Sequence, residues 1–320
     1  MPSLSYYRRV FAAYLGGAKS QLSFWHEQPA VNEQAFGADP LPYYMTFAEK
    51  ARYSGPFDEN GVPLLDYHGR IGKQHNPIAI AQFGLASLNS DNEAGALICA
   101  DWLVEKLKPN AKGIPVWMHE FNWEYFRPLR APWYSGLAQG QGVSLLLRAA
   151  RASGESRYLD TARRAATALL TPIEKGGVLH MDDKGDGWIE EYIVEPPTHI
   201  LNGFLWALWG VWDLLKLDEA HRDRPQFEEL WNRSLTTLEK NLSRFDCGYW
   251  SLYDLAPLPR ANTASPFYHR LHIVQLDVMH RLSGRAVFKT WHDQWAGYLQ
   301  SPRNRRRAWM AKALFKLRHY

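Results

Sequence analysis

The sequence predicts a mainly α-helical protein, folded as an α/α toroid of about four helical hairpins that form an incomplete barrel. From residue 76 onward, pairs of helix-forming segments recur with starts roughly 55 to 70 residues apart. Within a pair, the first segment is the more apolar and the second the more charged, as inner and outer helices would be. Strand-like segments separate the pairs, and we expect them to form short β-hairpins at one end of the array.

The first 75 residues differ from this repeating region. Residues 6–18 have the pattern of a short helix, whereas residues 39–44 and 54–58 are rich in turn residues and aromatic residues. Gly61 to Tyr67 has the pattern of a short strand. We therefore expect an N-terminal arm or β-hairpin layer over residues 1–75, the α/α toroid over residues 76–300 and a basic C-terminal tail over residues 301–320.

Prolines and N-cap residues set the predicted helix starts. Pro77 opens the first helix, at a position where its missing N–H would have no partner in any case. Pro196-Pro197 ends a strand, and Thr198 is the predicted N-cap of a very apolar helix that begins at His199. The predicted helices span residues 77–88, 93–107, 138–153, 156–170, 199–215, 224–241, 271–282 and 286–298. The predicted strands span residues 113–126, 177–180 and 187–194, with a hairpin-like segment at 249–255.

The composition is that of a globular protein with an excess of aromatic residues. Hydrophobic residues make up 46% and charged residues 22%, whereas aromatic residues reach 14%, with 14 Trp and 16 Tyr. This excess is typical of a carbohydrate-binding cleft, and equally of the core of a helical array. Cys99 and Cys247 are too few for a disulfide framework. Without a signal pattern or a stretch long enough to cross a membrane, we expect a cytoplasmic protein with no stable membrane insertion.

An excess of positive charge is concentrated near the C-terminus of the sequence. Of the 37 Lys and Arg residues, seven lie in the last twenty positions, where no acidic residue occurs. The remaining 30 basic residues face 33 acidic ones, so the body is slightly acidic and gives no reason to expect nucleic-acid binding. The tail has the pattern of a solvated basic helix, or of a docking patch for an acidic polymer or a membrane surface.

Several common catalytic motifs are missing from the sequence. His119 and Glu120 are adjacent, and His269 and His272 are three residues apart, but neither pair has the ligand count of a zinc site. The glycine-rich run over residues 136–142 lacks the Lys and Ser or Thr of a P-loop, so its glycines allow close packing or open a substrate groove. No Gly-x-Ser-x-Gly elbow is present. We therefore expect no metal and no redox cofactor.

Tyrosines and carboxylates recur at one place in the repeat, in or just after the hairpin that precedes an inner helix. If the toroid forms, these groups converge at one mouth of the array. A tyrosine with a pKa near 10 is a poor base, but a neighbouring cation or phenol makes its anion accessible for removing a weakly acidic carbon-bound proton. The alternative is that these tyrosines only stack on sugars or pack the hairpins. The groups are Glu190-Glu191-Tyr192, Tyr253-Asp254 and Tyr268-His269.

Five blocks in the chain occur in an order that identifies a resemblance. They are Asn-Pro-Ile-Ala-Ile-Ala-Gln-Phe-Gly-Leu at 76–85, Gly-Gln-Gly-Val-Ser-Leu-Leu-Leu-Arg at 140–148, Trp-Ile-Glu-Glu-Tyr at 188–192 with Leu-Asn-Gly-Phe at 201–204, Leu-Tyr-Asp-Leu at 252–255, and Tyr-His-Arg-Leu-His-Ile-Val-Gln-Leu at 268–276. Over roughly residues 70 to 300, the chain resembles the C-terminal domain of the D-glucuronyl C5-epimerases. These enzymes convert glucuronate to iduronate in heparan-sulfate precursors.

The resemblance implies a helical toroid as the catalytic domain, with acid/base residues at Glu191, Tyr192, Tyr253 and Tyr268. The chain departs from the animal enzymes at Ala256, where they carry an arginine directly after Tyr-Asp-Leu. A carboxylate-binding cation is therefore absent here or has moved, with Arg260 and Arg270 as candidates. The animal enzymes also have a large β-rich N-terminal region and a membrane anchor, whereas about 75 residues precede the resemblance here.

The implied reaction inverts C5 of a hexuronate within a heparosan-like acidic polysaccharide. Removing the C5 proton, which is α to a carboxylate, gives an enediolate whose charge needs donors placed in advance. We assign Glu191 or Tyr192 to one face of the sugar and Tyr268 to the other, with Tyr253 in support. A homodimer is one arrangement that the aromatic arm would allow. The predicted substrate-binding residues are Gln74, Asn76, Gln82, Gln141, Asn202, His269, Arg270 and His272.

Three other functions compete with this interpretation. A polysaccharide lyase shares the first proton abstraction but then expels the C4 substituent. A glycoside hydrolase on the same scaffold would use Glu191 and Asp254 as its carboxylate pair. A non-catalytic glycan-binding protein would hold a sugar in the aromatic cleft without turnover. The ordered blocks favour the epimerase, since a shared fold alone does not decide function.

Overall fold

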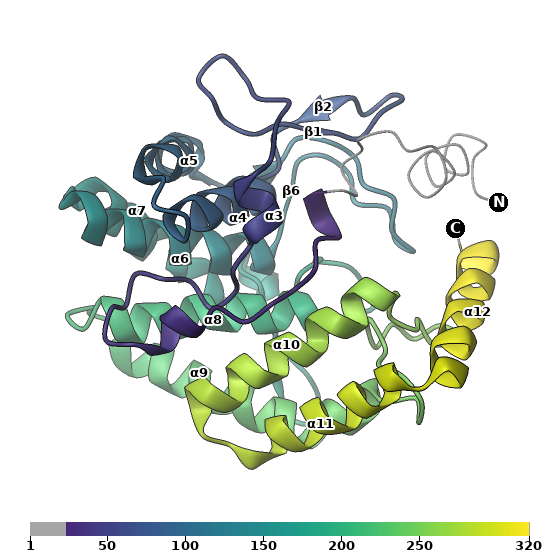
Figure 1. Ribbon diagram of the computed structural model, residues 1–320. Helices are drawn as coiled ribbons and strands as arrows, with labels where there is room; N and C mark the ends of the chain where they lie inside the picture. Colours follow the sequence, from purple (N-terminus) through teal and green to yellow (C-terminus); the bar gives the residue numbers. More distant parts are fainter. Residues whose placement is uncertain (1–23, 320) are drawn as a thin grey trace.

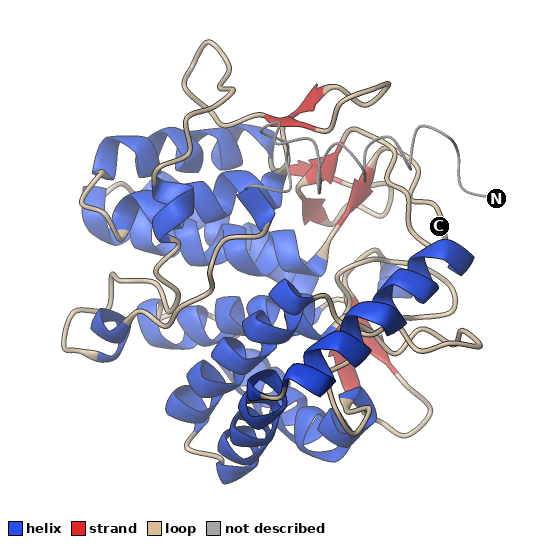
Figure 2. Ribbon diagram, turned by 45° about the vertical axis from the view of Figure 1, so that its right-hand side comes forward, coloured by secondary structure: helices blue, strands red, loops and turns tan. Residues whose placement is uncertain are grey.

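Helices dominate the computed structural model, which describes residues 24–319, and the predicted fold class is confirmed (Figures 1 and 2). The first helix of each pair packs against the first helix of the next, so α4, α6, α8 and α10 form an inner row. Within the described residues this row does not close into a barrel. The pairs are α4 (Pro77–Leu88) with α5 (Glu93–Lys106), α6 (Gly136–Ser153) with α7 (Ser156–Leu170), α8 (Leu201–Leu217) with α9 (Arg224–Asn241), and α10 (Pro266–Ser283) with α11 (Ala286–Gln300).

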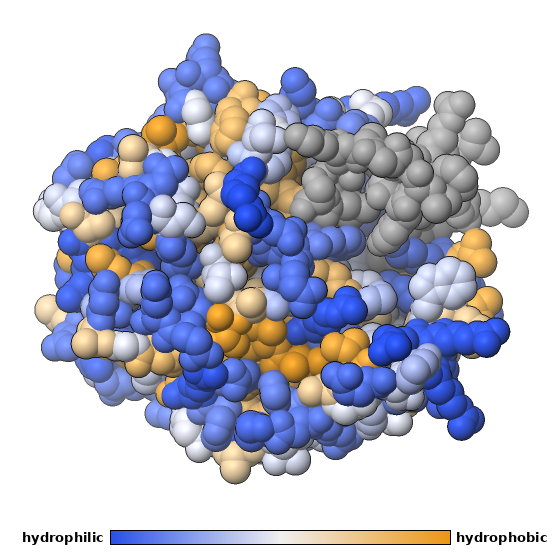
Figure 3. Space-filling view, in the orientation of Figure 1, coloured by the Kyte–Doolittle hydropathy of each residue, from blue (hydrophilic) through white to orange (hydrophobic). Residues whose placement is uncertain are grey.

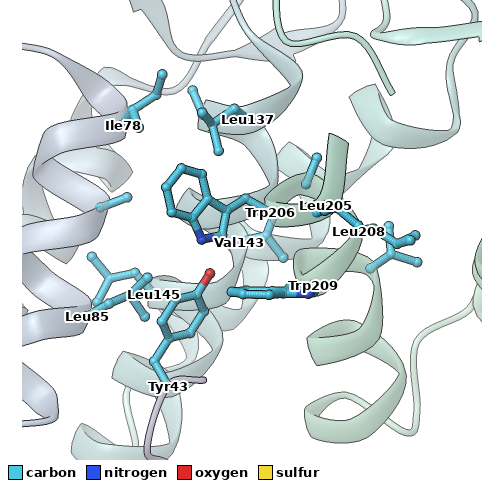
Figure 4. Close-up of a cluster of buried hydrophobic side chains, with 14 of the residues drawn as sticks. Tyr43, Ile78, Leu85, Leu137, Val143, Leu145, Leu205, Trp206, Leu208 and Trp209 are labelled. Atoms are coloured by element: carbon cyan, nitrogen blue, oxygen red, sulfur yellow. The ribbon is translucent and has the colours of Figure 1, made fainter. Parts of the chain in front are cut away.

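The inner helices α4, α6 and α8 are buried on nearly every side, whereas the inner helix α10 and the outer helices bury one face. Residues 136–149 of α6 are all buried, but α7 alternates buried alanines with exposed charges. Figure 4 shows the centre of the core, where Trp206 and Trp209 of α8 lie beside Leu145 of α6 and Tyr43 of the arm. This sorting follows the hydropathy of the sequence, because a mostly apolar helix whose few polar side chains have partners can be covered by neighbours on both sides.

Glycines let α6 and α8 cross in close contact. A Cβ atom added to Gly210 would lie 2.3 Å from the carbonyl oxygen of Gly140, and one added to Gly140 would lie 2.4 Å from the Cα atom of Ala207. Distances this short are not compatible with a side chain. The close-packing interpretation of the glycine-rich run at residues 136–142 is therefore confirmed at Gly140.

The strands are short antiparallel pairs between the helical hairpins. The predicted strand over residues 113–126 is wrong in its length, because it is interrupted at Trp117. The backbone N–H of Trp117 donates to Gln139 Oε1 at 3.0 Å, and its indole donates to the carbonyl of Leu103 at 2.8 Å, so helices rather than strands hold it. The pairs are β1 (Leu65–Asp66) with β2 (Lys73–Gln74), β3 (Lys108–Pro109) with β4 (Pro115–Val116), β5 (Met118–His119) with β6 (Trp133–Tyr134), and β7 (Leu179–Met181) with β8 (Gly187–Ile189).

Two predicted helix starts need correction. Helix α8 begins at Leu201 after Ile200 as N-cap, so Thr198 is not the N-cap, and its buried hydroxyl makes no hydrogen bond with the described residues. His199 instead has a left-handed backbone with φ 50°, which takes it out of the helix. Helix α10 begins at Pro266, earlier than predicted, because the hydroxyl of Ser265 caps it.

The described part of the arm is held against the inner helices by a buried ion pair. Asp213 of α8 binds both Arg148 of α6, at 2.6 and 3.0 Å, and the hydroxyl of Tyr44, at 2.5 Å. Arg148 also donates to the carbonyl of Leu41 at 2.8 Å. The predicted helix at residues 6–18 lies outside the described residues. Besides the β1–β2 pair, the described part of the arm contains η1 (Glu33–Phe36) and α3 (Ala48–Ala51). Two further 3-10 turns are η2 (Ile173–Lys175) and η3 (Leu242–Phe245).

The basic tail forms helix α12 (Pro302–His319), which packs beside α10 and α11. Ala308 and Phe315 are buried, so one face of the helix belongs to the fold. Figure 3 shows hydrophilic side chains near its start and hydrophobic ones toward its end, at the right of the view. The large exposed apolar residues of this helix are Trp309, Met310, Leu314 and Leu317. Across residues 24–319, no helix combines the length and the apolar character that a bilayer crossing requires.

Candidate active site

A cavity of about 120 Å³ lies where the inner helices begin. Asn76 is the N-cap of α4, Leu137 lies in the first turn of α6, Asn202 in that of α8, and Tyr268 in that of α10. The positive ends of four helix dipoles therefore point toward this region, and they favour a negatively charged ligand. The remaining lining residues come mainly from the arm and the hairpins, and most are aromatic: Trp25, His26, Tyr67, Ile78, Phe121, Trp123, Trp133, Glu191, Tyr192 and Trp206.

Glu191 is the carboxylate that faces the cavity. Its side chain is buried, and desolvation raises its pKa to about 8, with the nearby charges of Asp254 and Glu190 acting in the same direction. A hydrogen bond with Tyr192 lowers the pKa in part. A Cβ atom on Gly203 would lie 2.2 Å from Glu191 Oε2, so the glycine of Leu-Asn-Gly makes room for this carboxyl. At neutral pH, Glu191 is therefore mostly protonated and is able to donate a proton.

Glu190 has a different environment, although it is the next residue. Its Oε1 accepts a hydrogen bond from His199 Nδ1 at 2.5 Å, and its Oε2 accepts one from the backbone N–H of His199 at 3.1 Å. The ring of Trp188 stacks on the imidazole with centroids 4.2 Å apart. Neighbouring residues in an extended segment point to opposite sides. The pair Glu190–His199 thus supports the loop, whereas Glu191 faces the cavity.

The predicted tyrosines gather around this carboxyl. Tyr192 and Tyr268 line the cavity, and Tyr253 packs edge-on against Tyr268 with ring centroids 4.7 Å apart. Desolvation raises the pKa of Tyr253, and the charge of Glu191 adds to this effect. The three segments that carry these residues are far apart in the chain. The segments around residues 191, 253 and 268 thus lie close together, with Tyr253 behind the ring of Tyr268 and outside the described cavity wall.

Asp254 does not belong to the described lining of the cavity. Its Oδ2 accepts hydrogen bonds from the hydroxyl of Tyr125 at 3.0 Å and from Asn262 Nδ2 at 2.7 Å, and its Oδ1 accepts one from the backbone N–H of Ala256 at 3.2 Å. Burial raises its pKa. Asp254 thus acts as a rigid acceptor behind the cavity, and Tyr125, which it holds, packs against Tyr192 with ring centroids 5.0 Å apart.

Two of the predicted substrate-binding residues reach the cavity. Asn76 lines it while capping α4, and Asn202 lines it with its Nδ2 3.5 Å from Glu191 Oε2. Gln82 and Gln141 are buried between α4 and α6, where they form a hydrogen bond of 3.0 Å with each other. Gln74 donates to the carbonyl of Ile71 at 2.6 Å within its own turn. Neither this pair nor Gln74 is part of the described cavity wall.

The structure also places His269, Arg270 and His272 outside the described cavity wall. Both imidazoles lie in the core, and each has its Nδ1 within 2.9 Å of the hydroxyl of Ser251. Desolvation lowers the pKa of His269 to about 3 and that of His272 in the same direction, so neither ring supplies positive charge at neutral pH. His269 and Arg270 follow Tyr268 by one and two residues, so the helix turns them about 100° and 200° away from it.

Sequence reasoning missed the aromatic wall and the contribution of the arm. Trp133 packs edge-on against Tyr192 with ring centroids 5.6 Å apart, and His26 packs edge-on against Tyr268 at 6.2 Å. Burial lowers the pKa of His26 to about 4, so this imidazole is neutral at physiological pH. The dense aromatic residues between 117 and 134 were a usable signal for the wall. Nothing in the local pattern around His26 indicated a site residue.

The described residues contain no group of three or more His, Cys, Asp or Glu side chains arranged to hold a metal ion.

Comparison with known proteins places this chain in a protein family. The family model described as "D-glucuronyl C5-epimerase C-terminus" matches residues 112–297. The chain is 32% identical over 215 residues to a D-glucuronyl C5-epimerase of Caenorhabditis elegans. The aligned region covers 64% of this chain and 35% of the relative. It is 27% identical over 183 residues to an uncharacterised protein of Methanocaldococcus jannaschii, covering 56% of each. The chain thus spans about a third to just over half of these two relatives.

Proposed function

This chain belongs to the D-glucuronyl C5-epimerase C-terminus family, and from that premise we propose that it inverts C5 of D-glucuronate to L-iduronate within a heparosan-like polysaccharide. The observation that carries the proposal is the meeting of Glu191, Tyr192 and Tyr268 at one cavity. Aromatic walls suit the flat C–H faces of sugar rings. The converging helix starts suit an anionic uronate and the further charge that develops when its C5 proton leaves.

The proposed reaction transfers one proton in each of two steps. A base takes the C5 proton, the C–H electron pair moves into the carboxylate to give an enediolate, and an acid on the other face delivers a proton to C5. Glu191 and Tyr192 share a hydrogen bond and act as one unit on the first face. Tyr268 serves the other face, with Tyr253 behind its ring. The oxidation state of the sugar does not change.

The position of Asp254 weighs against the hydrolase alternative. A hydrolase needs two carboxyl groups beside the scissile bond, whereas Asp254 is held by Tyr125 and Asn262 behind the cavity. The lyase alternative uses Tyr268 and the same first proton abstraction. The arrangement of the site therefore does not distinguish a lyase from an epimerase, and the reaction product does.

The proposal is tested by incubating the protein with heparosan in heavy water and recording NMR spectra. We expect deuterium at C5 and the appearance of iduronate signals. Tyr268→Phe should reduce the exchange by about 100-fold or more, because a positioned acid or base contributes that much. Tyr158→Phe is the matched control. The hydroxyl of Tyr158 donates a hydrogen bond to Asp101, and both residues lie on outer helices, so this substitution should leave the exchange unchanged.

Two results would contradict the proposal. Intact heparosan without deuterium at C5 would indicate a glycan-binding protein. An unsaturated product that absorbs in the ultraviolet would indicate a lyase.

A further inference from the structure

Helix α12 carries a lysine into the back of the candidate site. Lys312 lies on the inner side of this helix, two turns before its end, while Ala308 of the same helix packs in a cluster with Tyr253 and Tyr268. The loop that precedes α10 contacts α12 through Asn262, which accepts a hydrogen bond from Lys312. The helix begins at Pro302, so it lies beyond the residues 112–297 that match the family.

The ammonium of Lys312 is linked to the cavity through a chain of contacts. Lys312 Nζ donates to Asn262 Oδ1 at 2.7 Å, and Asn262 Nδ2 donates to Asp254 Oδ2 at 2.7 Å. The same carboxylate oxygen accepts from the hydroxyl of Tyr125 at 3.0 Å, and the Tyr125 ring packs on Tyr192. A change in the position of Lys312 would therefore be transmitted through these contacts to Tyr192 in the cavity wall.

Lys312 also lies directly over a predicted catalytic phenol. Its Nζ is 5.5 Å from the ring centroid of Tyr253, within the range of a cation–π interaction. The ionisable groups that raise the pKa of Tyr253 are Glu191 and the neighbouring phenols, and Asp254 lies close to Glu191. A uronate entering the cavity would bring a negative charge into these buried surroundings, and the ammonium of Lys312 would offset it.

The environment of Lys312 brings its titration close to neutral pH. Desolvation lowers its pKa to about 7, and the charge of Lys316 on the same helix acts in the same direction. Asp254, on the loop that packs against α12, raises the pKa. The other titratable groups of this cluster are Tyr253 and Tyr249 on the preceding loop, Cys247 beside them, Tyr268 of α10 and Tyr298 of α11, and Arg307 of α12 lies over the ring of Tyr249.

We propose that Lys312 is a positioning residue of this site, which orders Asn262, Asp254 and Tyr125 and supplies the counter-charge that lets an anionic uronate occupy the cavity beside Tyr253. The proposal rests on the proposed function for its substrate class. It also assigns a role to the basic tail, which lies outside the matched part of the family.

The first test compares the pH dependence of kcat/KM for Lys312→Met and Lys312→Arg with that of the wild type. Lys312→Met should lower kcat/KM by about tenfold or more, since an opposite charge at this range shifts acid–base equilibria by that factor. In the wild type, the lysine loses its charge as pH rises through about 7. The arginine variant keeps its charge, so it should retain a larger share of its activity at pH 8.5 than the wild type does.

The matched control is Arg307→Met. Arg307 lies on the same helix and covers the ring of Tyr249 at 3.8 Å, so its loss removes an equal charge and a docking contact of α12. It should leave kcat/KM and its pH profile unchanged. Equal effects of Lys312→Met and Arg307→Met, or an arginine variant with the wild-type profile, would reduce Lys312 to a residue that only docks the helix.

The second test does not depend on turnover. Acetylation of Lys312 by acetic anhydride, followed by peptide mass spectrometry, should show a rate that rises with a midpoint near pH 7. Heparosan oligosaccharides should lower the rate at pH 7 by about fivefold or more, because a bound anion holds the proton on the amine. Carboxyl-reduced oligosaccharides of the same length should have no such effect.

The two tests separate the two proposals. Protein that shows charge-selective protection of Lys312 but no deuterium exchange at C5 would contradict the proposed epimerase activity and support the role of Lys312. Equal labelling with both oligosaccharides would overturn the role of Lys312, even in an active epimerase.

Discussion

Glu190 and Glu191 show how two identical side chains in sequence acquire different roles. The extended backbone sends one carboxylate to His199 and the other into the cavity. The local sequence carries no signal for which of the two carboxyl groups faces the cavity, because both lie on the same short segment before Pro196. The presence of a carboxylate pair beside Tyr192 was predictable from the sequence, whereas the choice between the two required the position of His199.

At this scale, we expect Glu191→Gln to stabilise the protein at alkaline pH. Burial raises the pKa of Glu191 from its ordinary value of 4.5 to about 8, so between these values the folded protein keeps a proton that the unfolded chain releases. Wild-type stability should therefore fall as pH rises through this window. The glutamine cannot ionise and avoids the loss. The difference in melting temperature between Glu191→Gln and the wild type should therefore be at least about 2 °C larger, in favour of the variant, at pH 8.5 than at pH 5.

Glu190→Gln is the matched control for this measurement. It removes a carboxylate whose partner His199 is close, so it should lower the melting temperature at both pH values. A gain for Glu190→Gln, or a difference for Glu191→Gln that does not change with pH, would contradict the assignment of the two side chains.

Among the elements, the helices were predicted better than the loops. Pro77 fixes the start of α4 by local chemistry, whereas Ser265 and Pro266 carried the same signal for α10, which the prediction missed by placing its start at residue 271. The start of α8 was misplaced because a tertiary contact, from Glu190 to His199, overrides the local preference for a cap at Thr198. Strand ends were misjudged for the same reason at Trp117, which helices α5 and α6 hold.

The crossing of α6 and α8 gives a test of packing at the scale of elements. Gly210→Ala should lower the free energy of unfolding by about 1–3 kcal/mol, because its methyl group would meet the backbone of Gly140. Gly297→Ala is the matched control, since no atom lies within 4 Å of the added methyl group on α11. The control should raise stability by up to about 1 kcal/mol through helix propensity. Urea denaturation followed by tryptophan fluorescence measures both, and similar values for the two variants would contradict the close crossing.

For the whole molecule, the cavity depends on segments that the repeat does not contain. The repeat predicted that residues 191, 253 and 268 would meet, because each occupies a similar place before or at the start of an inner helix. It did not predict the contributions of Trp25 and His26 from the arm or of Lys312 from the tail. Those positions follow from long-range packing, for which a single sequence has no periodic signal.

The attachment of the arm gives a prediction at this largest scale. Arg148→Met should lower the free energy of unfolding by about 3–5 kcal/mol, because it leaves the buried carboxylate of Asp213 without its cation. Arg233→Met, on the exposed face of α9, removes an ion pair with Glu229 and should change stability by less than about 0.5 kcal/mol. Urea titration would measure both variants. A loss below about 1 kcal/mol for Arg148→Met would show that the arm is held mainly by its aromatic contacts.

The path of the chain around the cavity has a consequence for biosynthesis. The wall draws on residue 25 as well as residue 268, and the lysine behind it is residue 312. The described cavity wall is therefore complete only after residues 25 to 268 have been synthesised and have folded together, and Lys312 reaches its position only after α12 has docked. A nascent chain that ends before α10 lacks the part of the wall that Tyr268 provides.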